Sequence, residues 1–144
     1  MQADVRCPRA PGMPRGRRGQ SLLEVGIALP LLLLLMAGVV DLAHVFSVAG
    51  ILQNAAREGA RWGATFHPTD SAAIDDIKNR VIQEAAGSPL TLDAGEIQVD
   101  PDSGVANSGD PVTITVTHQV DLLLSQALGL PSLTIVRSAS MAMF

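Results

Sequence analysis

The sequence predicts an α+β protein in which a long N-terminal helix precedes a short second helix and a small antiparallel β-sheet. Three observations lead to this fold. Residues 22–40 are almost entirely apolar, the apolar positions from 45 to 66 recur at helical spacing, and the last third of the chain alternates between apolar and polar residues. The 144 residues leave room for one small domain besides a membrane span.

The first expected element is a transmembrane helix over residues 20–41. Its segment from Leu22 to Val40 carries one charge, Glu24. As a helix this segment extends about 28 Å, close to the ~30 Å hydrocarbon core of a bilayer. Pro30 should kink it mildly, because proline removes one backbone hydrogen bond. Asp41 marks the outer boundary of the span.

The helix should continue beyond the membrane as a stalk over residues 42–66. The apolar positions alternate at spacings of three and four, which places them in a seam on one helical face. His67-Pro68 should end it, because the residue before a proline is biased away from the helix. One helix is therefore expected from about Ser21 to Phe66. The seam comprises Val45, Val48, Leu52, Ala55, Gly59, Trp62 and Phe66.

Residues 67–144 should form a small α+β head. Asp70 or Ser71 can cap a second helix over residues 72–86. Alternating, β-branched stretches predict strands at 96–100, 112–120 and 133–144, with an irregular or short helical link at 122–131. The strand face that carries Val112, Ile114, Val116, His118 and Val120 should point toward the helix seam.

Residues 1–19 read as a basic leader peptide in which no helix is expected, because prolines recur there. They carry five Arg against one Asp, whereas residues 20–144 carry five Lys/Arg against thirteen Asp/Glu. The basic flank should stay in the cytoplasm and the acidic part should be exported. Acidity of the exported part argues against nucleic acid as a partner. The lone cysteine, Cys7, lies in the leader and forms no disulfide framework.

Three stretches carry a more specific pattern. Gly19-Gln-Ser-Leu-Leu-Glu24 separates the leader from the leucine run, Val39-Val-Asp41 follows this run, and residues 52–62 read LQNAAREGARW. Together, from Arg18 to about Ala64, they resemble the TadE-like family, pseudopilins of tight-adherence (Flp) pilus systems. The resemblance implies a pilin-like fold, cleavage by a prepilin peptidase and single-pass insertion in the inner membrane with an extracytoplasmic head. The implied partners are this peptidase, membrane lipid, other pilin-like subunits and the pilus assembly platform.

Gly19, Gln20 and Glu24 are the expected processing residues, with cleavage after Gly19. A carboxylate inside an apolar span calls for a partner. The resemblance implies that Glu24 pairs with the new Gln20 amine of a neighbouring subunit and so sets the register of stacked helices. Two alternatives stay open: an uncleaved signal anchor, or a signal peptide cut after Ala49, where Ser47-Val-Ala49 has small-x-small form.

Small residues on the stalk helix are candidates for helix packing. Ala55, Gly59 and Gly63 lie four apart, as do Ala56, Ala60 and Ala64. Small side chains let helices approach closely, so the first row is an expected assembly face. The alternative is that the same rows pack against the chain's own sheet.

No catalytic, cofactor or metal site is expected. His44, His67 and His118 are scattered, and the acidic residues at 75–76 and 100–102 read as solvated faces. The sequence thus predicts a structural protein, a minor pilin or pseudopilin, rather than an enzyme. The alternative function is a signal-anchored extracytoplasmic binding domain without a role in a pilus.

Overall fold

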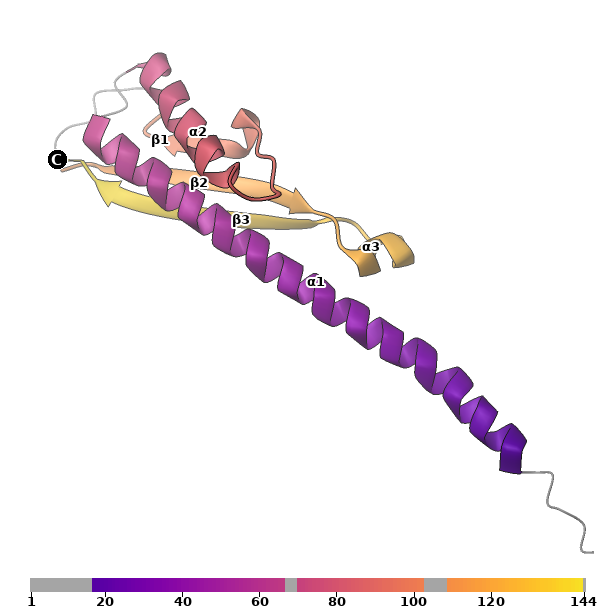
Figure 1. Cartoon of the computed structure of the whole chain (residues 1–144). Coiled ribbons are helices and arrows are strands. Elements are labelled where there is room, and N and C mark those ends of the chain that lie inside the picture. The colour runs from indigo at the N-terminus through magenta and orange to yellow at the C-terminus, as the bar shows by residue number, and fades with distance from the viewer. Residues whose placement is uncertain (1–16, 67–69, 103–108, 144) are drawn as a thin grey trace, which may run out of the picture. The chain divides into compact units, whose positions relative to one another are not determined.

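The computed structural model describes residues 17–66, 70–102 and 109–143. Its elements, in chain order, confirm the α+β prediction: a long apolar helix, a short helix and a three-stranded antiparallel sheet (Figure 1). The elements are α1 (Arg17–Phe66), α2 (Ser71–Ala85), a 3₁₀ turn η1 (Ala94–Glu96), β1 (Ile97–Asp100), β2 (Pro111–Val120), α3 (Leu123–Leu128) and β3 (Leu133–Ala142).

Contacts divide the chain into two compact units between Met36 and Ala37. The first unit contains the apolar half of α1, with Pro30 inside the helix. The second contains the rest of α1, α2, α3 and the sheet.

Helix α1 begins at Arg17, slightly earlier than expected, so the expectation of no helix in residues 1–19 is wrong for its last three residues. No proline lies beyond Pro14 in the leader, and arginine is a good helix former, so nothing in Arg17-Arg-Gly19 stops the helix. The rest of the leader lies outside the described residues. Asp70 is the N-cap of α2, and its Oδ1 accepts a hydrogen bond from the Ala73 N–H at 2.8 Å.

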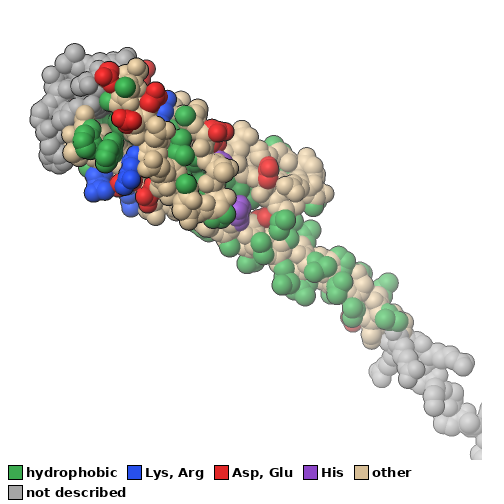
Figure 2. Space-filling view, turned by 45° about the horizontal axis from the view of Figure 1, so that its top comes forward, with side chains coloured by type: hydrophobic (Ala, Val, Ile, Leu, Met, Phe, Trp, Pro, Cys, Tyr) green, Lys and Arg blue, Asp and Glu red, His purple; other side chains and the backbone are tan. Residues whose placement is uncertain are grey.

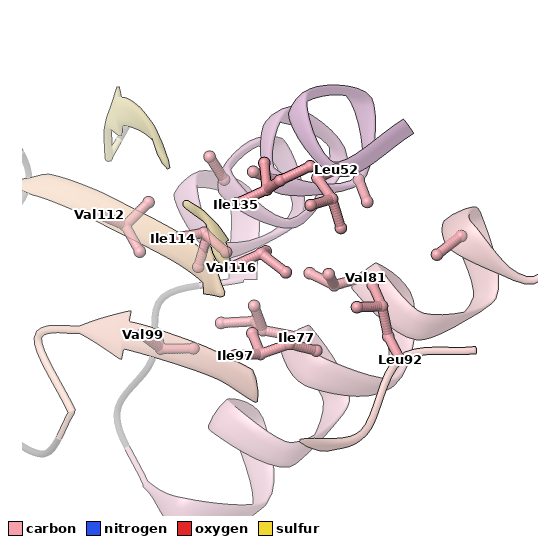
Figure 3. Close-up of a cluster of buried hydrophobic side chains, with 14 of the residues drawn as sticks. Leu52, Ile77, Val81, Leu92, Ile97, Val99, Val112, Ile114, Val116 and Ile135 are labelled. Carbon is pink, nitrogen blue, oxygen red and sulfur yellow. The ribbon is translucent and has the colours of Figure 1, made fainter. Parts of the chain in front are cut away.

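The sheet has the order β1-β2-β3, with both pairs antiparallel. Its central strand, β2, buries Val112, Ile114, Val116 and Val120. In Figure 3 the side chains of Ile114 and Val116 point into a core shared with Leu52 of α1 and Val81 of α2. The sequence predicted that this face of β2 points toward the α1 seam. This prediction is confirmed for the four buried residues of the strand.

Two seam positions differ from the prediction. Phe66, expected on the buried seam, is exposed, and Trp62 is half-buried; their ring centroids lie 4.3 Å apart. The buried face instead passes through the alanine row, Ala56, Ala60 and Ala64. An α-helix has 3.6 residues per turn, so a strict repeat of three and four drifts around the helix over several turns.

Candidate functional site

The predicted processing residues lie in the first two turns of α1. Gly19, Gln20 and Glu24 are all exposed, and a Cβ added at Gly19 would meet no atom within 4 Å. Gln20 and Glu24 are four positions apart, so they share one face of the helix, about 6 Å apart along its axis. The geometry therefore leaves the Gly19–Gln20 segment and the Glu24 carboxylate on the surface of this helix.

The apolar half of α1 exposes nearly all of its large side chains. They include Leu22, Leu23, Ile27, Leu31, Leu33 and Leu35. The helix is long and apolar enough to cross a membrane. Green side chains accordingly crowd this segment in Figure 2, whereas red and blue side chains gather on the second unit. A continuous apolar surface of this kind is compatible with a membrane anchor.

The small residues on the other half of α1 face the chain's own head. Ala55 is fully buried. A Cβ added at Gly59 would collide with the Val81 side chain of α2 and reach Ile114 of β2. One added at Gly63 would lie 3.1 Å from Val112 and 3.3 Å from Ile77. The structure therefore favours packing within the chain for these positions, the alternative that the sequence left open.

Asp41 has a role that the sequence did not reveal. It is 7% exposed, and its two carboxylate oxygens accept hydrogen bonds from the backbone N–H groups of Leu123 (2.8 Å) and Leu124 (2.9 Å). These are free N–H groups of the first turn of α3, which a negative charge stabilises. Asp41 thus caps α3 from another part of the chain, more than eighty residues away in sequence. The sequence signal was present, since an acidic residue directly after an apolar run is conspicuous, but no pattern named its partner.

Glu58 anchors a second polar cluster on the surface of the head. Its carboxylate accepts hydrogen bonds from Arg61 at 2.8 Å and from Arg80 of α2 at 3.0 Å, while its side chain is 17% exposed. The hydrogen bond from Arg61 is the largest cause of a lowered Glu58 pKa, and the hydrogen bond from Arg80 acts in the same direction. Arg80 also lies over the Trp62 ring, 5.6 Å from its centroid. The cluster ties α2 to α1.

His118 pairs with an acidic residue, and three of the aspartates line one cleft. His118 is part-buried on β2, and its Nδ1 lies 2.8 Å from the Glu96 Oε1. Asp75, Asp100 and Asp102 come together along one open cleft between α2 and β1, where Lys78 also lies. Asp75 is an exposed residue of α2, as expected for a solvated face. His44 lies exposed on α1, and His67 falls outside the described residues.

Comparison with known proteins gave one result. A search found no significant match among curated proteins or among solved structures. A family model described as TadE-like protein matches residues 19–61. The match covers Gly19, Gln20, Glu24 and Asp41, the apolar half of α1, and the small residues through Ala60. Residues 19–61 are therefore similar to TadE-like proteins, as the sequence resemblance predicted.

Proposed function

We propose that this protein is a minor pilin or pseudopilin that takes part in assembling a tight-adherence pilus. The observation that carries the proposal is the coincidence of two features in one segment. The TadE-like match spans residues 19–61, and the first half of that match, residues 22–40 of α1, exposes a continuous apolar surface after a basic leader. Its role is structural: the chain anchors, packs and assembles, and it acts on no substrate.

A prepilin peptidase cuts the chain after Gly19 in this proposal. The cut removes the basic leader and leaves a mature chain that begins at Gln20. The absence of a side chain at Gly19, its exposure and the apolar helix that follows directly all suit such a cleavage. The new α-amine, with an ordinary pKa near 7.7–8.0, then lies one helical turn from Glu24.

Glu24 acts in assembly. A carboxylate near the end of an apolar span is costly without a partner. In a bundle of such helices the Gln20 amine of a neighbouring subunit supplies that partner, and the pair fixes the axial register of the two helices. The other partners are the pilin-like subunits and the assembly platform of the pilus, with lipid around the unassembled helix.

The leader faces the cytoplasm and residues 42–144 lie outside the inner membrane. The five leader arginines and the acidic remainder of the chain support this orientation. Reporter fusions after Phe66 and at the C-terminus should both give an extracytoplasmic signal. A cytoplasmic signal from either fusion contradicts the orientation.

The test of the assembly role is Glu24→Leu, with Ala28→Leu as the matched control one turn along the same helix. Both substitutions leave the span at least as apolar, so processing and membrane level should stay normal. Glu24→Leu should abolish pili and crosslinks to other pilin-like subunits, because the amine loses its carboxylate. The control should keep both. Normal pili and crosslinks in Glu24→Leu would overturn the assembly role.

A further inference from the structure

The link between β2 and β3 has an unusual surface. The link begins with the exposed Asp121, and after it residues 122–131 contain no charged side chain. Leu123, Leu128 and Leu130 are 57%, 61% and 58% exposed. A connection on the surface of a water-soluble domain is ordinarily polar, and exposed apolar side chains that cluster on one short segment indicate a contact site.

The polar groups of this link are largely satisfied within the chain. The first N–H groups of α3 donate to Asp41. The Ser125 hydroxyl donates to the Leu122 carbonyl at 2.8 Å and accepts from the Leu122 N–H at 3.1 Å, and the Leu130 N–H donates to the Ser125 carbonyl at 2.8 Å. Internal pairing of backbone groups is what a segment needs before it can lie in an apolar medium.

The link is also held against the outer end of the apolar run of α1. Asp41 directly follows that run and bonds the first turn of α3. Leu124 packs beside Gly38, where an added Cβ would lie 3.6 Å from the leucine Cδ1. On α1, the neighbouring Val39 and Leu42 are exposed. Within the second unit, exposed apolar side chains therefore occur both on the link and on the segment of α1 that the link contacts.

We propose that the link of residues 122–131 is a second membrane contact, inserted in the outer leaflet of the same bilayer that holds α1. The inference rests on the proposed membrane anchoring. A bilayer that covers residues 25–40 reaches Asp41 and hence the segment that Asp41 caps. The lack of charge in residues 122–131, the internal pairing of polar groups and the contacts with Gly38 and Asp41 favour lipid over a second copy of the chain as the occupant.

The experiment places one spin label at a time on the full-length protein, reconstituted in liposomes of phosphatidylethanolamine and phosphatidylglycerol. Leu128→Cys probes the link, Leu32→Cys the span, and Asp75→Cys an exposed position of α2, each with Cys7→Ser to remove the native thiol. Collision with oxygen, which concentrates in lipid, is compared with collision with a water-soluble nickel chelate. The ratio of oxygen to nickel collisions at 128 should resemble that at 32 and exceed that at 75.

Each other outcome overturns the inference in a distinguishable way. Free access of nickel at 128, with residue 32 in lipid, would place the link in water and leave the proposed function intact. Protection of 128 from both reagents would assign the surface to a protein neighbour instead of lipid. Nickel access at 32 would remove the anchor itself, and with it both the proposed function and this inference.

Discussion

The two halves of helix α1 differ in the size and exposure of their side chains. The half before Ala37 presents large apolar side chains, such as Leu31 and Leu35, to its surroundings. The half from Val48 to Ala64 presents alanine and glycine to its own sheet and buries them. Large exposed leucines need an apolar environment from outside the chain, whereas small buried residues are already fitted to a partner within it.

A row of small residues on a helix can serve packing between subunits or packing within one chain. A row of alanine and glycine suits close helix packing between subunits. In this chain the row already packs against α2 and β2. The large apolar side chains that α1 exposes lie mainly in the leucine-rich half, which also carries the exposed Glu24. The following predictions test this division, beginning with the largest expected effect.

Val116→Asp should unfold the head. Val116 is fully buried at the centre of β2, and an unpaired carboxylate there costs several kcal/mol out of the roughly 5–15 kcal/mol that holds a domain. Val136→Asp on β3 is the control, because Val136 is 50% exposed. Circular dichroism of the fragment 37–144 in mild detergent should show a cooperative melt for the control only. An unchanged melt in Val116→Asp would show that the strand face is assigned wrongly.

Gly59→Val should destabilise the head by about 1–3 kcal/mol, the usual cost of overpacking a core. The new Cβ would displace Val81, whereas Gly50→Val adds the same side chain at an exposed helical position with no atom within 4 Å. The pair therefore separates core packing from helix propensity. Denaturant unfolding of the fragment 37–144 measures both, and equal losses in the two variants would refute the close packing at Gly59.

The sequence predicted the parts of this fold that depend on local pattern. The long helix, the Asp70 cap and the three strands follow from apolar spacing, turn residues and β-branched runs. The Asp41–α3 contact and the Glu96–His118 pair could not be predicted, because they join segments 82 and 22 residues apart and depend on how the sheet packs on α1. The contacts of Ala55, Gly59 and Gly63 within the chain depend on the same packing.

Asp41→Asn should loosen α3 and lower the stability of the fragment 37–144 by about 1 kcal/mol, the typical cost of losing a helix cap. Asparagine keeps the shape but has one acceptor oxygen and no charge for the two N–H groups of Leu123 and Leu124. Hydrogen exchange at these two amides should accelerate. Asp121→Asn, at an exposed neighbouring position, should leave it unchanged, and protected amides in Asp41→Asn would contradict the cap.

Glu58→Gln should have the smallest effect, about 0.5–1 kcal/mol, because Arg61 is largely exposed and solvent weakens the pair. The folded state lowers the Glu58 pKa from its ordinary 4.5, chiefly through the Arg61 hydrogen bond, so the carboxylate is favoured in the folded protein. Its contribution is present above pH 4.5 and is lost as the pH falls through the lower pKa of the folded state. The variant should show a weaker loss of stability in that acidic range; an identical pH profile would exclude Glu58 as a contributor.

The most direct test of the proposed function is the N-terminus of the mature chain. Intact mass of the protein extracted from membranes of cells with an active prepilin peptidase should correspond to a chain beginning at Gln20, with allowance for a modified amine. Gly19→Arg should retain the precursor, because a long side chain obstructs a peptidase site fitted to glycine. A mass beginning at Met1 would indicate an uncleaved anchor and one beginning at Gly50 a removed signal peptide, and either result would contradict the account.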